Sequence, residues 1–426
     1  MHINLIRVPD PTSIDDMLDE PLGLLYVAAN LLKEGFDVSI SDYRGTDDIC
    51  IKEADMYGIQ LYTPTAHIGI KIAKRIKRMH PWAYIVAGGA HVTAVPYFDT
   101  AGVFDMVCYG EGEMAMPVIA GYREKRGSQS KIWQANTIES LDAIPFPARH
   151  LVPIMDYHRK VEGHRCFGII GQRGCGYKCM FCDRALFGNR PRYRSVENIV
   201  KEIESCIDTY GVWHYEFFDD IPFPNLARIQ HFGEMTKGMG LEYRCNSRSD
   251  QKNDLIFKEM QKTGCKVVCF GIESGVQALL DAMKKGTTVE GNLNTIKMAK
   301  AAGLTTMGYF ILGYPGETKD TIKKTMEFVD NSGLDQAQFY TFVPLPGSEI
   351  YANLDKYGAK LITNDFSEFY HVTGTDGHGG KTIDTPWLKA DELHEEMQKV
   401  RKWLKERNSK GAMQDYYKEK LDYKTA

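Results

Sequence analysis

The chain has 426 residues, of which 43% are apolar and 25% are charged. At about 100–200 residues per domain this length predicts two or three domains, and the composition excludes a disordered or collagen-like chain. The net charge of −4 argues against a dedicated nucleic-acid binder. No signal-peptide pattern opens the sequence and no apolar run approaches ~20 residues, so we expect a cytoplasmic protein without membrane contact.

Residues 1–135 alternate strand-like apolar runs with helical patterns such as Pro21–Glu34 and Ile68–Met79. Strands alternating with helices predict a parallel sheet with right-handed crossovers. The fold class predicted here is α/β, with a doubly wound, flavodoxin- or Rossmann-like domain that binds ligands at the carboxyl edge of its sheet. The predicted strands are His2–Val8, Asp37–Ser41, Met56–Leu61, Tyr84–Ala87 and Met106–Cys108.

Residues 136–165 contain three prolines and no sustained hydrophobic period, which is typical of a linker. The alternation of strands and helices then returns over residues 166–349, where six βα units predict a partial barrel with its site at the carboxyl ends of the strands. Residues 350–426 contain one clear amphipathic helix, Lys389–Arg407, and we expect a small, mostly helical C-terminal region. The predicted barrel strands are Cys166–Gly171, His214–Phe218, Glu242–Asn246, Lys266–Gly271, Thr305–Ile311 and Ala337–Val343.

Three of the ten cysteines stand close together after the first barrel strand. Cys175, Cys179 and Cys182 follow the spacing C-x3-C-x2-C, and three thiolates within one short loop suit an iron–sulfur cube. A fourth cysteine at ferredoxin spacing is missing, so one iron would be left to bind a substrate. A zinc site or three unlinked thiols are the alternatives, but zinc sites usually add a second ligand pair, and none follows.

The loop and the motifs after it resemble the radical S-adenosylmethionine (SAM) superfamily. An aromatic residue, Phe181, precedes the last cysteine, and RGCGYKCMFCDRALFGNRPRYRS is followed in order by EFFDDIPFPN, FGIESG, YFILGYPGET and VPLPGS. Residues 1–350 are similar to the branch with an N-terminal cobalamin-binding domain. The resemblance implies a [4Fe–4S] cluster on the three cysteines, with SAM at the fourth iron. Reductive cleavage of SAM would then give a 5′-deoxyadenosyl radical.

The resemblance also implies which residues contact SAM. Phe181, Tyr309, Ile311 and Leu312 would lie near the adenine. Asp219 or Asp220 would hold the ammonium group, Arg248 the carboxylate and Glu273 the ribose hydroxyls or the ammonium group. Two alternatives stay open, because a strand-end aspartate is often a helix N-cap and Arg248 could form a surface ion pair.

In the N-terminal domain, GGAHVT and YGEGE follow predicted strands. Glycines there let the backbone approach a bulky ligand, although tight turns alone would also explain them. The resemblance implies cobalamin, as methylcobalamin, between the two domains, with no histidine ligand to cobalt and the loop 61–65 under the corrin. The implied contacts are Tyr62, Thr63, Gly88, Gly89, His91, Thr93, Gly110 and Glu111.

Six basic residues within 22 positions surround the cysteine loop: Arg173, Lys178, Arg184, Arg190, Arg192 and Arg194. Such a field could attract an anionic small-molecule substrate. Alternatively, these residues raise the cluster's potential, pair with distant acids or dock the reductant. The family resemblance implies a one-electron donor such as flavodoxin or ferredoxin.

Taken together, the resemblance predicts a cobalamin-dependent radical SAM methyltransferase that methylates an unactivated carbon. A cyclase, rearrangement or oxidation enzyme with the same cofactors is the alternative. A third possibility is that the first domain has lost cobalamin and serves as a substrate or partner module.

Overall fold

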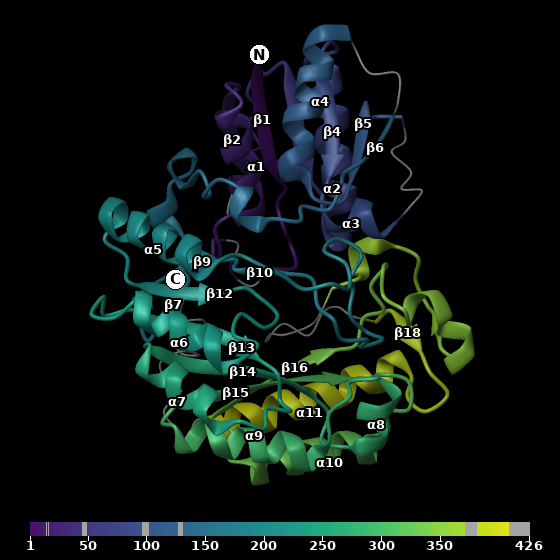
Figure 1. Cartoon of the computed structure of the whole chain (residues 1–426). Helices are drawn as coiled ribbons and strands as arrows, with labels where there is room; N and C mark the ends of the chain where they lie inside the picture. Colours follow the sequence, from purple (N-terminus) through teal and green to yellow (C-terminus); the bar gives the residue numbers. More distant parts are fainter. Residues whose placement is uncertain are drawn as a thin grey trace.

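The structure is a computed structural model that describes residues 1–13, 15, 17–44, 49–95, 102–126, 131–370 and 381–408, with the backbone alone at 123–126 and 408. Its two large sheets are parallel and have six strands each. The N-terminal sheet lies above the barrel sheet in Figure 1.

The N-terminal sheet has the order β2-β1-β3-β4-β5-β6 and is covered on both faces. Side chains of α1 and α4 form one core cluster with the sheet, and those of α2 and α3 form another on the opposite face. All five predicted strands are present; β6 is an additional short edge strand. The elements are β1 (His2–Arg7), α1 (Leu22–Lys33), β2 (Asp37–Asp42), β3 (Met56–Gln60), α2 (Ala66–Met79), β4 (Tyr84–Gly88), α3 (Ala90–Ala94), β5 (Met106–Tyr109), α4 (Gly112–Arg126) and β6 (Ile132–Gln134).

Residues 136–165 connect the two sheets through three single-turn 3-10 helices and one short hairpin. The 3-10 helices are Leu141–Ala143, Arg149–Leu151 and Ile154–Asp156, and the hairpin pairs β7 (Lys160–Val161) with β8 (His164–Arg165).

The second sheet is an open barrel with the order β16-β15-β14-β13-β12-β9. Adjacent strands pair in parallel, so all six carboxyl ends meet at one rim. The strands are β9 (Phe167–Ile169), β12 (His214–Phe217), β13 (Glu242–Ser247), β14 (Cys265–Glu273), β15 (Thr305–Leu312) and β16 (Gln336–Thr341).

Local sequence sets where the barrel helices start and stop. Ser195 caps α5 by accepting a hydrogen bond from the Asn198 N–H at 3.1 Å, and Gly211 ends it in the left-handed conformation at φ 64°. Both are preferred end signals. The helices are α5 (Val196–Tyr210), α6 (Leu226–Met235), α7 (Asp254–Lys262), α8 (Gln277–Ala282), α9 (Val289–Ala301) and α10 (Lys319–Ser332).

The C-terminal region packs on the barrel. Its long helix α11 (Ala390–Asn408) matches the predicted Lys389–Arg407 within one residue and lies against β16 and α10. Trp403 of this helix meets Phe339 edge-on at 5.9 Å between ring centroids. Before it come two 3-10 helices, Tyr351–Tyr357 and Phe366–Glu368, and the strand pair β17 (Lys360–Leu361) and β18 (Ile383–Asp384).

Candidate active site

The cysteine loop follows β9 at the barrel rim. It is framed by β10 (Gln172–Arg173) and β11 (Arg192–Tyr193), which pair antiparallel. The buried Asp219 carboxylate accepts hydrogen bonds from the Gly171 N–H (2.8 Å) and the Gln172 N–H (2.9 Å). Gly174 has φ 78°, and a Cβ there would lie 2.6 Å from the Arg190 carbonyl oxygen. Only glycine allows this close approach.

The thiols of Cys175 and Cys179 lie close enough to Cys182 to contribute to its raised pKa. Cys179 is buried, and Cys175 and Cys182 are half-buried. Burial, with smaller contributions from Asp220 and the other two thiols, raises the pKa of Cys182 to about 12. Among the described residues, no three possible ligands converge on one metal ion. A cube, in contrast, takes each thiolate on a different iron, so this all-sulfur donor set fits a cluster better than a single ion.

Asp219 and Asp220 lie in different environments. Asp219 is fully buried on the loop backbone, and burial raises its pKa to about 7. Its oxygens are occupied by backbone N–H groups, so we assign it to support of the loop and not to contact with the SAM ammonium group. Asp220 is exposed, acts electrostatically on Cys182, and keeps the predicted ammonium role as a proposal.

Arg248 and Glu273 reach the same loop from β13 and β14. The Arg248 guanidinium stacks over the Tyr177 ring at 3.5 Å and donates to both carboxylate oxygens of Asp250 at 2.8 and 2.7 Å. Arg248 therefore presents two N–H donors that can hold a carboxylate, and in this structure the nearby Asp250 accepts from them. The Glu273 carboxylate accepts a hydrogen bond from Lys285 at 2.7 Å.

The predicted adenine contacts on β15 divide between two faces, because side chains alternate along a strand. Tyr309 and Ile311 are half-buried on the inner face, whereas Leu312 is fully buried in the outer core under the barrel helices. The Leu312 side chain therefore lies on the face opposite Ile311, and the predicted place of Leu312 beside the adenine stays a prediction. Phe181 lies in the cysteine loop and packs against a small core cluster that also receives Ile311.

Sequence patterns did not reveal Lys285, which follows α8 and lies at this site. Its Nζ is 5.9 Å from the Phe181 ring centroid. Burial lowers the pKa of Lys285, but nearby negative charge, Glu273 foremost, outweighs that effect and the net shift is upward. Lys285 has no characteristic spacing from the cysteines, so only the fold brings it there.

A cavity of about 500 Å³ lies between the two domains. This volume is within the ~300–1,000 Å³ range of small-molecule sites. Predicted residues Tyr62, Gly88, Gly89, Gly110 and Glu111 line its N-terminal side. Its barrel side includes Ile170, Arg173, Leu186, Phe187 and Phe218.

Glycines keep the N-terminal wall of this cavity open. Gly89 has φ 107°, and a Cβ there would lie 2.8 Å from the Leu61 carbonyl oxygen. At Gly58 an added Cβ would come within 2.7 Å of Leu5. This wall fits a bulky ligand such as a corrinoid, since side chains at these positions would fill the space.

Three predicted cobalamin contacts lie behind this wall instead of lining it. His91 is fully buried, with Nδ1 3.2 Å from the Thr63 hydroxyl and its ring edge-on to Phe366 at 4.9 Å. Burial lowers its pKa to about 4. The Thr93 hydroxyl donates to the Gly89 carbonyl at 2.9 Å and accepts from the Gly110 N–H at 3.0 Å. The structure thus gives His91, Thr63 and Thr93 supporting positions.

Glu111 connects the two domains through a buried ion-pair network. Its carboxylate accepts from Arg173 at 2.9 Å, Arg192 at 2.7 Å and the Ile138 N–H at 2.7 Å. Arg173 also donates to Glu113 at 2.6 Å. All four charged side chains are at most 8% exposed. Arg173 and Arg192 lie in β10 and β11, the two strands that form the stem of the cysteine loop. Glu111 therefore binds this stem to the N-terminal domain.

This network favours one interpretation of the basic run around the cysteines. Arg173 and Arg192 pair with Glu111, and Arg194 pairs with the buried Glu202 at 2.6 Å. These three arginines neutralise acids from elsewhere in the chain. They do not supply a free positive field for an anionic substrate.

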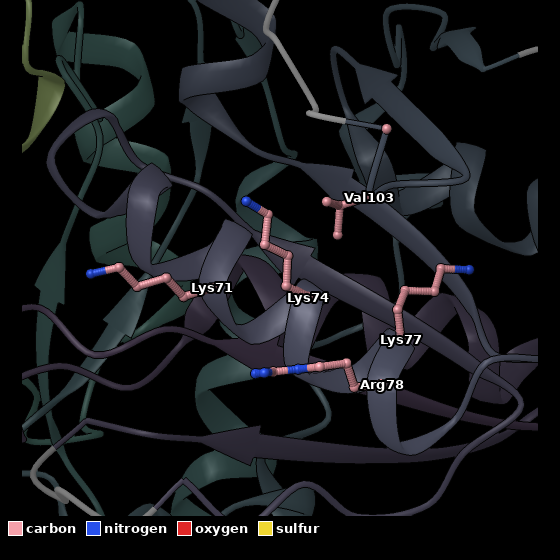
Figure 2. Close-up of a pocket in the computed structure, with 6 residues that line it drawn as sticks. Lys71, Lys74, Lys77, Arg78 and Val103 are labelled. Atoms are coloured by element: carbon pink, nitrogen blue, oxygen red, sulfur yellow. The ribbon is translucent and has the colours of Figure 1, made fainter.

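A second basic surface lies on α2 of the N-terminal domain and shares no residue with the interdomain cavity. A shallow pocket is lined there by Lys71, Lys74, Lys77 and Arg78. Lys77 extends away from the other three (Figure 2) and binds Asp105 at 2.7 Å. The four side chains do not converge on one point, so this pocket is not a preformed anion site.

The remaining seven cysteines lie apart from the loop. Cys50 is exposed and the other six are buried. Burial raises the pKa of Cys206 to about 11 and that of Cys108 to about 12.

Comparison with known proteins agrees with this arrangement. The family model of the Radical SAM superfamily matches residues 169–329, and the B12 binding domain matches residues 19–120. The chain is 31% identical to the "Uncharacterized methyltransferase PH0819" of Pyrococcus horikoshii, over 82% of each chain. It is 25% identical to the anaerobic magnesium-protoporphyrin IX monomethyl ester cyclase of Cereibacter sphaeroides, over 83% of this chain and 63% of that one.

Two solved structures share the fold. The cobalamin-dependent SAM radical enzyme OxsB matches with a TM-score of 0.72 at 15% identity, over 100% of this chain and 71% of that one. The radical SAM methyltransferase TsrM from Kitasatospora setae matches with a TM-score of 0.66 at 17% identity, over 85% and 81%.

The fold and site define an α/β enzyme with a cysteine-loop barrel beneath a ligand-binding domain. The chain belongs to the radical SAM enzymes that carry a B12-binding domain. SAM with a [4Fe–4S] cluster and cobalamin are the cofactors of this family. Among the described helices, none is long and apolar enough to span a bilayer.

Proposed function

We propose that this protein methylates an unactivated carbon of a small-molecule substrate, using SAM, a [4Fe–4S] cluster on Cys175, Cys179 and Cys182, and cobalamin. When bound, these cofactors supply a carbon radical on the substrate and a methyl group for it. An external one-electron donor, flavodoxin or ferredoxin, completes the set of partners.

The observation that carries this proposal is the position of the interdomain cavity. One wall is the glycine-rich edge of the N-terminal sheet, and the other includes Ile170 and Arg173 from the stem of the cysteine loop. A ligand in this cavity therefore lies next to the loop that would bind the cluster. The similarity to a protein named as a methyltransferase over 82% of the chain supports the same reaction class.

The inner face of the barrel offers a polar wall for the substrate. Arg159 donates to Asp19 at 2.7 Å and to Glu216 at 2.8 Å, and Glu216 lies 3.4 Å from Arg244. Arg244 donates to the Tyr309 hydroxyl at 2.6 Å. Two acids balance two arginines along this chain, so we propose a polar substrate that is held by hydrogen bonds.

The second candidate is a cyclisation or oxidation without net methyl transfer. The observation that favours it is the 25% identity to the cyclase named above over 83% of this chain. The two candidates share cofactors and differ only in the fate of the substrate.

The test uses protein purified without oxygen, rebuilt with iron, sulfide and cobalamin, and given SAM with a deuterated methyl group, a reductant and a small-molecule extract. Methyl transfer predicts a product that carries the label, together with S-adenosylhomocysteine and 5′-deoxyadenosine. Product that has lost mass and has no label would favour the second candidate. Cys179→Ala serves as the control, since it should not hold the about four irons of one cube.

A further inference from the structure

The end of β14 is strained beside the cysteine loop. Glu273 has φ 67°, and the pairing with β15 shifts register between Gly271 and Glu273. A non-glycine residue in this conformation is unfavourable and persists where its surroundings enforce it. Lys284, with φ 50°, is a second such residue and immediately precedes Lys285.

This strained geometry brings two opposite charges together in the interior. Lys285 Nζ lies 2.7 Å from Glu273 Oε1, and the side chains are 11% and 8% exposed. A Cβ at position 271 would collide with Glu273 Oε1 and lie 2.8 Å from Lys285 Nζ. Gly271 thus leaves the space that the pair occupies.

The pair is attached to the cysteine loop on the side of Cys179. The Met180 N–H donates to the Met283 carbonyl at 3.0 Å, so the turn that holds Lys285 is bonded to the loop. Lys285 Nζ also lies 5.9 Å from the ring centroid of Phe181, two residues after Cys179 in the same loop. Neither thiol chemistry nor packing alone requires a buried lysine at this position.

We propose that Lys285 and Glu273 form a charge pair that sets the reduction potential of the cluster, Lys285 raising it and Glu273 lowering it. This inference rests on the proposed binding of the cluster by the three cysteines. Reduction adds one electron from an external donor to the cluster, which makes the site more negative by one charge. A fixed cation nearby stabilises that added charge, and a fixed anion opposes it.

The pair also holds Lys285 in place. With Glu273 as its partner, the ammonium group stays charged in a site where desolvation would otherwise favour its neutral form. Lys285 is therefore a positioning residue for charge and does not need to touch the substrate.

The experiment compares Lys285→Met, Glu273→Gln and the double variant in dithionite titrations followed by electron paramagnetic resonance, without SAM. At a fixed potential, Lys285→Met should lower the ratio of reduced to oxidised cluster at least tenfold. For one electron this corresponds to a reduction potential lowered by ~59 mV. Glu273→Gln should raise it, and the double variant should return near wild type. Lys285→Arg keeps the charge and should stay within about threefold.

Lys284→Met is the matched control, since this adjacent lysine is about half exposed and pairs with Glu349 at the surface; its ratio should not change. Iron content separates the two proposals. A wild-type chain that binds no cube overturns the proposed function. A chain that binds the cube, with single variants that shift in the same direction or by less than threefold, overturns the charge-pair proposal. If Lys285→Met does not fold, the upward shift in Glu273→Gln still tests it.

Discussion

Replacing Glu111 with glutamine tests whether this residue clamps the cysteine loop to the N-terminal domain. The substitution keeps the volume of the side chain and removes its charge. Breaking a buried ion pair by removing one partner costs about 3–5 kcal/mol. Arg173 keeps its bond to Glu113, and glutamine can still accept the Ile138 N–H. We therefore expect the lower end of that range, about 3 kcal/mol, for Glu111→Gln and the full range for Glu111→Ala.

The matched control is Glu139→Gln. Glu139 also pairs with an arginine of this region, Arg190, but both side chains are about two-thirds exposed. Exposed pairs contribute about 0–1 kcal/mol. Hydrogen exchange of the cofactor-free chain is followed at β5 in the N-terminal domain and at β10 before the cysteine loop. It measures the free energy of local opening on each side of the Glu111 ion pairs.

Glu111→Gln should increase hydrogen exchange at both β5 and β10, whereas Glu139→Gln should leave exchange at both strands unchanged. Equal effects of the two variants would refute the argument, because burial is the property that distinguishes them. An effect confined to one domain would show that Glu111 stabilises its own domain and does not connect the two.

Three further predictions concern the same site. Burial raises the pKa of Asp219 to about 7, so the folded chain retains a proton that the unfolded chain releases near pH 4. The free energy of unfolding should therefore fall as pH rises between these two values. Urea titrations of Asp219→Asn should lack that dependence on pH. Gly89→Ala should lower the free energy of unfolding by roughly 1–3 kcal/mol and weaken cobalamin binding in equilibrium dialysis. The control is Gly121→Ala in α4, where the space around the glycine is open; it should raise the free energy of unfolding by about 0.5–1 kcal/mol. Arg248→Lys loses the planar fork and should weaken SAM binding about tenfold by calorimetry, about 1.4 kcal/mol; an unchanged affinity would assign Arg248 to its Asp250 pair alone.

The sequence predicted the strands that are buried on both faces, because such strands are continuous apolar runs. All five predicted N-terminal strands are present. The strand β6 has three residues at the sheet edge, with Ile132 and Gln134 exposed, so it has no apolar run to detect. Barrel strands such as β13 and β16 instead alternate buried and half-buried residues. The regular alternation of strand-like and helical stretches predicted the barrel strands, with ends that differ by a few residues.

The site was predictable where spacing along the chain is itself the signal, as in the cysteine loop. It was less predictable where partners come from distant segments. Glu111 meets Arg173 and Arg192 across 62 and 81 positions, so the sequence could not show that its carboxylate is already bound. Leu312 is a different case, because strand alternation places its side chain on the face opposite Ile311, and the sequence alone could have shown that difference.

The burial of six cysteines has a practical consequence for loading the enzyme in vitro. An iron–sulfur cube needs several thiolates held together in one place, and the cysteine loop supplies three. Cys108 and Cys206 are buried elsewhere in the chain, and Cys50 stands at the surface away from the loop in sequence. Competition for iron during assembly should accordingly be low, and in the loaded enzyme a single alkylating label at Cys50 would report whether the rest of the polypeptide has stayed closed.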